Sequence, residues 1–117
     1  MQNFRDIKVW QKSHEMVLQI YSLSRKFPAE EKFGLCSQLR RAALSVPANI
    51  AEGSKRIGRA EYARFLNIAE ASLAETQYLL ILAQDLGYVR KEGALEAETR
   101  EIEVMLHALR TRVEARV

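Results

Sequence analysis

The sequence predicts an all-α protein, an up-and-down antiparallel four-helix bundle that occupies residues 1–117 as a single domain. Three observations support this fold class. The chain has 117 residues, which is a usual size for one domain. Its two prolines and five glycines are too few for the many turns of a sandwich or barrel. Four stretches rich in helix-forming residues lie between these glycines and prolines.

The four stretches predict helices at residues 6–26, 34–56, 60–86 and 92–116. The loops between them are short, which favours antiparallel neighbours. Asp6 is a suitable N-cap for the first helix, because its carboxylate can accept from the first free backbone N–H groups. Gly87 is a suitable residue to end the third, because glycine adopts the left-handed conformation found just after many helices.

Two apolar stripes run along the first predicted helix. At 100° per residue, one stripe contains Ile7, Trp10, His14, Val17, Leu18 and Tyr21, and the other contains Val9, Met16, Ile20, Leu23 and Phe27. We assign the first stripe to the core, with His14 as a packed histidine. A helix on the outside of a single bundle buries one stripe. The second stripe therefore predicts contact with a neighbouring subunit, and a wide core face is the alternative.

The other three helices have clear core positions. We expect the second to bury Leu35, Leu39, Ala42, Val46 and Ile50; the third Tyr62, Phe65, Leu66, Ala69, Leu73, Thr76, Leu80 and Ala83; and the fourth Leu95, Ile102, Met105, Leu106, Leu109 and Val113. Pro47 lies inside the second pattern, where it predicts a kink or a break.

Four further residues complete the candidate subunit interface. Leu79 and Leu82 give the third helix a second apolar side. Arg41 and Glu52 are 11 residues apart on the second helix. At a rise of 1.5 Å per residue they are separated by roughly 16 Å and cannot pair with each other. Each of these two charged residues needs a partner on another helix, on another subunit or in water.

Cysteine usage and hydropathy predict a cytoplasmic protein that does not enter a membrane. Cys36 is the single cysteine, so an internal disulfide is impossible and a reducing compartment is favoured. The polar N-terminus lacks the apolar segment of a signal peptide. The longest apolar run, residues 78–83, is far shorter than the roughly 20 residues needed to span a bilayer.

Positive charge is concentrated in the first half of the chain. Residues 1–64 hold 12 Lys and Arg against 6 Asp and Glu, although the net charge of the whole chain is only +3. Clustered cations on one surface are what phosphate contacts require. The candidate nucleic-acid-binding residues are Arg40, Arg41, Lys55, Arg56, Arg59 and Arg64.

A solubilising surface is the alternative interpretation of these cations. Lys55 and Arg56 lie where a helix ends, and cations are favourable there because of the helix dipole. Arg59 precedes a helix, so the dipole does not explain it. No aromatic residue lies between Lys55 and Arg59, which favours contact with the phosphate backbone over recognition of bases.

The sequence offers little support for catalysis, for a metal or for a cofactor. No P-loop, GxGxxG, HExxH, CxxC or GxSxG motif occurs. The two histidines, His14 and His107, lie in different helices. Arg100 and His107 resemble the Arg-x4–6-His signature of the all-α ribonucleases called HEPN. Both residues point away from the apolar stripe of the fourth helix, so we expect an exposed charged face and no enzymatic activity.

Four segments, residues 4–14, 35–53, 65–75 and 85–88, resemble the four-helix-bundle proteins encoded in intervening sequences of bacterial 23S rRNA genes. The central segment, LCSQLRRAALSVPANIAEG, is the most specific of them. The resemblance implies a homopentameric ring with no established enzymatic activity. It also implies kinship with the accessory protein of diversity-generating retroelements, which binds a reverse transcriptase and nucleic acid through a basic surface.

These observations predict a non-catalytic, oligomeric bundle that binds RNA or DNA, or a ribonucleoprotein or reverse-transcriptase partner, through basic residues. A structural scaffold that docks another protein, with charge serving only solubility, is the main alternative. A ribonuclease that uses Arg100 and His107 is the third.

Overall fold

Four α-helices make up most of the computed structural model, which describes residues 3–90 and 93–115. They are α1 (Lys8–Ser24), α2 (Leu35–Ser54), α3 (Arg59–Asp85) and α4 (Leu95–Glu114). Two short 3-10 helices, Phe4–Asp6 and Ala29–Glu31, precede α1 and α2. The described residues contain no β-strand. The predicted class and the number of helices are confirmed. Helices α1, α2 and α4 are shorter than predicted by one to three residues at each end, and α3 begins and ends one residue earlier than predicted. The predicted ends of the fourth helix, residues 92 and 116, lie outside the described residues.

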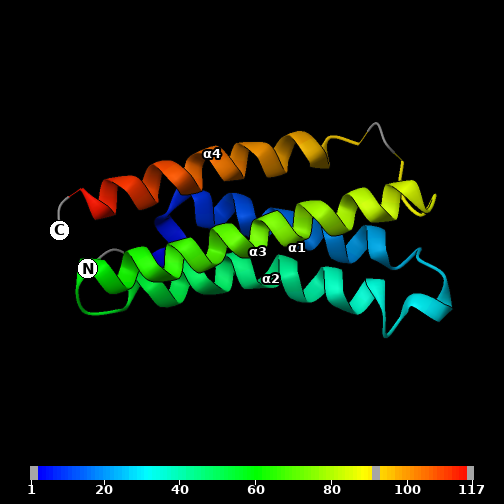
Figure 1. The fold of residues 1–117 in the computed structure, drawn as a ribbon, viewed down its shortest axis with the longest axis horizontal. Helices are drawn as coiled ribbons and strands as arrows, with labels where there is room; N and C mark the ends of the chain where they lie inside the picture. The colour runs from blue at the N-terminus through cyan, green and yellow to red at the C-terminus, as the bar shows by residue number, and fades with distance from the viewer. Residues whose placement is uncertain (1–2, 91–92, 116–117) are drawn as a thin grey trace.

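Successive helices run in opposite directions and pack side by side (Figure 1). Each helix packs against its neighbours in sequence, and α1 also packs against α4, which closes the bundle. The molecule measures 45 × 25 × 20 Å. The connection between α2 and α3 lies at the left end of Figure 1, where α4 also ends. The other two connections lie at the opposite end.

Helices α2, α3 and α4 bury the stripes that their periodicity predicts. All five predicted core residues of α2 are buried. On α3, Tyr62 is half-buried and the other predicted positions are buried. On α4, Ile102, Leu106 and Val113 are buried, and the remaining positions of the stripe pack against the core from its edge. An apolar side chain gains about 1.5–3 kcal/mol from full burial, so these stripes determine which faces meet.

On α1 the structure buries most fully the stripe that was predicted to contact a neighbouring subunit. Ile7 of the other stripe is buried, and Trp10 and Val17 pack against the edge of the core, which agrees with the alternative of a wide core face. Met16 and Ile20 are 1% and 0% exposed within a single chain, and Val9, Phe27 and, on α3, Leu79 are also buried. Leu23 and Leu82 are half-buried against the same core. Assignment of the five buried residues to a subunit interface is therefore wrong, and that of the half-buried Leu23 and Leu82 stays a prediction. Arg41 and Glu52 are exposed, and their place in an interface stays a prediction.

The chemistry of the side chains explains which stripe is more fully buried. The buried stripe carries no polar ring atom or hydroxyl group, so its burial removes no hydrogen-bonding side-chain group from water. The other stripe carries Trp10, His14 and Tyr21, whose polar atoms are better placed at the edge of the core. His14 is exposed and stacks on Trp10 with ring centroids 5.2 Å apart. The expectation of a packed core histidine is therefore wrong.

Pro47 does not break α2, which continues from Leu35 to Ser54. The predicted cap at Asp6 is wrong, because Asp6 lies in the first 3-10 helix and Ile7 occupies the N-cap position of α1.

The predicted end of α3 is confirmed. Gly87 has a φ of 81°, its N–H donates to the carbonyl of Gln84 at 3.0 Å, and the N–H of Tyr88 donates to that of Ala83 at 2.9 Å. This pair of hydrogen bonds is a Schellman motif.

Gly53 allows α2 and α3 to approach closely near their connection. A Cβ atom at this position would lie 2.8 Å from Cβ of Phe65 and 3.1 Å from Cδ1 of Tyr62. Any larger residue would push these aromatic side chains away, and overpacking of this kind typically costs about 1–3 kcal/mol. The glycine therefore fixes where the Phe65 ring lies at this end of the bundle.

None of the described helices is both long enough and apolar enough to span a bilayer.

Candidate functional site

Four of the six predicted cations lie around the connection between α2 and α3. Residues 55–58 form this connection, because α2 ends at Ser54 and α3 begins at Arg59. We call Lys55, Arg56, Arg59 and Arg64 the basic loop cluster. All four side chains belong to exposed residues. The cluster is therefore at one end of the bundle and open to solvent.

The ring of Phe65 brings two members of the cluster together. The guanidinium carbon of Arg56 lies 4.8 Å from the ring centroid, and that of Arg64 lies 4.7 Å from it. Phe65 itself is 7% exposed. Guanidinium groups stack favourably on aromatic rings, and the contact restricts side chains that are otherwise flexible. Two positive charges at the surface thus lie against the same ring, each within 5 Å of its centroid.

The sequence pattern did not single out Phe65 as a partner of these cations, because it lies outside the connection itself. It lies one residue after Arg64 and nine after Arg56, and only the turn between α2 and α3 brings Arg56 back to it. The expectation that no aromatic residue accompanies the cluster is therefore wrong, because the fold places the Phe65 ring against two of its arginines. Because Phe65 is buried, it orders the two arginines and does not offer a ring on which a base could stack.

Glu61 accepts hydrogen bonds from Arg64 in a two-pronged pair. Nε of Arg64 lies 2.9 Å from Oε1, and Nη2 lies 3.2 Å from Oε2. The hydrogen bonds from Arg64 lower the pKa of the Glu61 carboxyl, and the charges of Arg64 and Arg56 add to this against the opposing effect of desolvation. An exposed pair of this kind is weak. Arg64 can therefore exchange this carboxylate for another anion.

Arg59 has the most open environment in the cluster. It is the first residue of α3, and its side chain makes no hydrogen bond or ion pair with another residue of the ranges 3–90 and 93–115. The preceding Gly58 has no side chain to cap the helix. The positive end of the α3 dipole therefore faces the same solvent as Arg59.

Arg112 of α4 also lies near this end of the bundle. Burial raises the pKa of the Tyr62 hydroxyl, and the positive charge of Arg112 acts in the opposite direction. Sequence periodicity could not reveal this proximity, because it depends on how α4 packs beside α3.

The remaining two predicted cations lie elsewhere. Arg40 is half-buried between α1 and α2: Nε donates to Ser24 Oγ at 2.8 Å, and Nη2 donates to the carbonyl of Tyr21 at 3.2 Å. Its guanidinium carbon lies 4.5 Å from the centroid of the Tyr21 ring. Arg40 thus joins two helices, and two of its donors have partners within the bundle. It lies apart from the basic loop cluster, and its place in a phosphate-binding surface stays a prediction.

Arg41 is exposed, in a polar groove between α2 and α3 where Ser45 and Ser72 are hydrogen-bonded at 2.8 Å. It precedes Arg56 by 15 residues, which is roughly 22 Å along a helix. Arg41 is therefore too far from the basic loop cluster to contact the same phosphate.

Arg100 and His107 do not form a catalytic pair in this structure. They lie two turns apart on α4, roughly 10 Å along its axis. Arg100 pairs with Glu96 at 2.8 Å, whereas Nδ1 of His107 lies 3.5 Å from Oε2 of Glu70. Both side chains are well exposed, and none of the described pockets is lined by both of them. Arg100 forms an ion pair within α4, whereas His107 lies beside Glu70 of α3 and Arg110.

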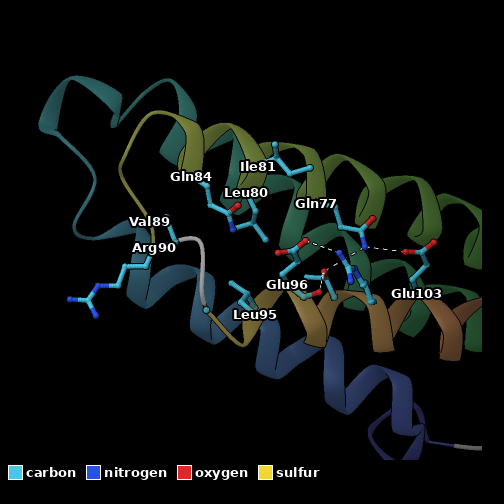
Figure 2. A pocket seen from close by; sticks show the side chains of 12 residues that line it. Gln77, Leu80, Ile81, Gln84, Val89, Arg90, Leu95, Glu96 and Glu103 are labelled. Atoms are coloured by element: carbon cyan, nitrogen blue, oxygen red, sulfur yellow. Dashed lines mark hydrogen bonds and ion pairs between the residues drawn. The ribbon is translucent and has the colours of Figure 1, made fainter.

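An apolar pocket of about 260 Å³ lies between α3 and α4, near the end opposite the basic loop cluster (Figure 2). Leu80, Ile81 and Leu95 form part of its lining. The polar side chains at its rim largely pair with one another, as in the hydrogen bond from Gln77 to Glu103 at 3.1 Å. No sequence pattern predicted this pocket, because it arises where α4 diverges from α3 after their connection.

Titratable side chains do not gather into a metal site. Across residues 3–90 and 93–115, no three His, Cys, Asp or Glu residues lie close enough together to hold an ion.

The contrast between Arg40 and Arg41 gives a direct test of their roles. Arg40→Met should lower the free energy of unfolding by about 1–3 kcal/mol, because it leaves the buried Ser24 hydroxyl without its donor and removes the stacking on Tyr21. Arg41→Met should change it by less than about 0.5 kcal/mol, as is usual for exposed positions. Urea denaturation followed by circular dichroism measures both. Equal stability of the two variants would contradict the structural role of Arg40.

Comparison with known proteins agrees with the fold. Residues 5–108 match the family described as 23S rRNA-intervening sequence protein. No curated protein matches the chain. A crystal structure of a protein with unknown function from the S23 ribosomal protein family of Bacteroides thetaiotaomicron is 30% identical, with a TM-score of 0.81 over 88% of this chain and 95% of that one. The family match covers α1, α2, α3 and most of α4, and the chain belongs to the 23S rRNA-intervening sequence protein family.

Proposed function

We propose that this protein binds RNA through the basic loop cluster, by contacts to phosphates and without catalysis. One observation carries the proposal: the Phe65 ring holds the guanidinium groups of Arg56 and Arg64 together at the surface, beside the exposed Arg59. Guanidinium groups donate several hydrogen bonds in a fixed plane and suit phosphate oxygens. Because the ring restricts two of them beforehand, less side-chain entropy is lost when a phosphate binds.

The surroundings of the cluster support an anionic ligand. The uncapped start of α3 adds the positive end of a helix dipole to the charges of the side chains. The family is named for proteins encoded within 23S rRNA genes, which favours RNA over DNA as the first ligand to test. RNA bound by a partner protein, such as a reverse transcriptase, would present the same phosphates. This proposal places the protein in the cytoplasm.

Charge reversal in the cluster tests this proposal. Arg56→Glu combined with Arg59→Glu should weaken RNA binding, and the slope of log affinity against log salt should fall by about 0.7 for each lost contact with single-stranded RNA. Fluorescence anisotropy of a labelled oligonucleotide at several salt concentrations measures both effects. The control is Arg25→Glu with Lys26→Glu, the same change of charge after the end of α1. Equal affinity and slope in the two double variants would overturn the assignment.

We also propose that the chain associates with copies of itself through the outer face of α2 and α3. Leu44, Ile68, Tyr78 and Ile81 are between 36% and 59% exposed on these two helices. Each is an apolar side chain that a single chain leaves partly in water, and Ile81 also lines the pocket between α3 and α4. These exposed side chains replace the stripe of α1 as the candidate contacts between subunits. They would equally serve a scaffold that docks another protein, which is the alternative to RNA binding.

Light scattering tests self-association. A ring of five copies requires a mass of five times 13.4 kDa. Tyr78→Asp with Ile81→Asp should lower the mass and keep the helical content, since both side chains are exposed and a charge buried at an interface is unfavourable. Leu18→Asp with Val104→Asp, on α1 and α4, should leave the mass unchanged. A mass of 13.4 kDa for the unaltered protein at high concentration would contradict the proposal.

A further inference from the structure

Ile57 is an apolar side chain at the tip of the connection between α2 and α3. It is 97% exposed, the highest value among the exposed large apolar residues. Arg56 precedes it, and Gly58 and Arg59 follow it. Gly58 has a φ of 92°, and the space where its Cβ would lie is open to 4 Å. The tip therefore projects from the bundle, and Ile57 lies away from the core.

A lone exposed apolar residue is ordinary on a protein surface. Phe33 is also 88% exposed in a connection, but Lys32 lies over its ring and two acidic residues, Glu30 and Glu31, precede it. Ile57 instead has cationic residues before and after it. Leu18 and Val104 lie on the outer faces of long helices, where they can cover part of the helix surface. Ile57 lies in a connection in which the neighbouring side chains are cationic. A polar residue would suit the same turn, so the fold does not require isoleucine at this place.

We propose that Ile57 contacts an unpaired base while Arg56 and Arg59 hold the adjacent phosphates, so that the ligand is single-stranded or looped RNA. This inference rests on the proposed binding of RNA by the basic loop cluster. Consecutive residues lie about 3.8 Å apart along the chain. A base against Ile57 therefore has its own backbone within reach of both arginines.

Base stacking explains why the ligand should be unpaired. In an A-form duplex the bases stack on one another, and the deep, narrow major groove keeps side chains away from their edges. An apolar side chain then has little surface to cover. In single strands, loops and bulges the faces of the bases are free, and apolar side chains can pack against them or wedge between them. Cations alone would bind both paired and unpaired RNA, so the preference for unpaired RNA comes from Ile57.

The charges near Ile57 favour this ligand over a membrane surface, which is also anionic. A whole myristoyl chain gives only marginal and reversible membrane binding, and the side chain of Ile57 is far smaller. Glu61 lies in the first turn of α3 and Glu52 in the last turn of α2, so acidic groups lie near the cations. Nucleic acid can thread between such groups more easily than a flat bilayer can accommodate them.

Ile57→Ser tests the inference without altering the charge of the cluster. The ligands are oligouridylate, which has no stable pairing, and a blunt RNA duplex with the same number of phosphates, both followed by fluorescence anisotropy. The substitution should weaken binding of oligouridylate by about tenfold, as partial burial of an aliphatic side chain would give, and leave its salt slope and the affinity for the duplex unchanged. Val104→Ser, the same kind of change at an exposed position of α4, should leave both affinities unchanged.

Each other outcome separates this inference from the proposed function. If the unaltered protein binds neither RNA, the proposed function fails and Ile57 loses its role with it. If it binds both RNAs and Ile57→Ser has no effect, or an equal effect on both, only the role of Ile57 is overturned. That role is also overturned if Ile57→Ser reduces sedimentation with phosphatidylserine vesicles and not binding of oligouridylate, or if it changes the mass in light scattering.

Discussion

The close approach of α2 and α3 at Gly53 is the constraint on which the basic end of the molecule depends. Because residue 53 has no side chain, Phe65 can lie directly against the backbone of α2. From there its ring reaches both Arg56 and Arg64. The contact thus links packing to electrostatics: a small residue in one helix fixes an aromatic ring in the next, and the ring fixes two cations at the surface. Neither arginine would have a defined place in a looser bundle.

Periodicity predicted the cores of α2, α3 and α4 well because each of these helices has a dominant apolar stripe. It failed on α1, where two stripes of similar length compete and the spacing alone cannot choose between them. The choice depends on polar atoms. Met16 and Ile20 can be buried without losing hydrogen bonds to water, whereas His14 and Trp10 have ring nitrogens that would lose them. This criterion can be applied to a sequence, and it would have corrected the assignment of the subunit interface.

The candidate site was predictable in part. A run of cations near a helix boundary indicated Arg56, Arg59 and Arg64, and these three do lie at one end of the bundle. Arg40 and Arg41 are adjacent in sequence and looked equivalent, yet they differ by about 100° around α2. Arg40 therefore contacts Ser24 and Tyr21 of α1, and Arg41 is exposed to solvent. The place of Phe65 between two arginines depends on the turn geometry, which no local pattern encodes.

Nuclear magnetic resonance offers the most direct measurement of the central contact. Protons that lie over the face of an aromatic ring are shifted upfield. The side-chain methylene protons of both Arg56 and Arg64 should therefore resonate upfield of those of exposed arginines such as Arg25 and Arg41, and nuclear Overhauser effects should connect them to the Phe65 ring. Ordinary shifts for both arginines, with no such connection, would contradict the account, because the basic end would then be a set of independent flexible charges.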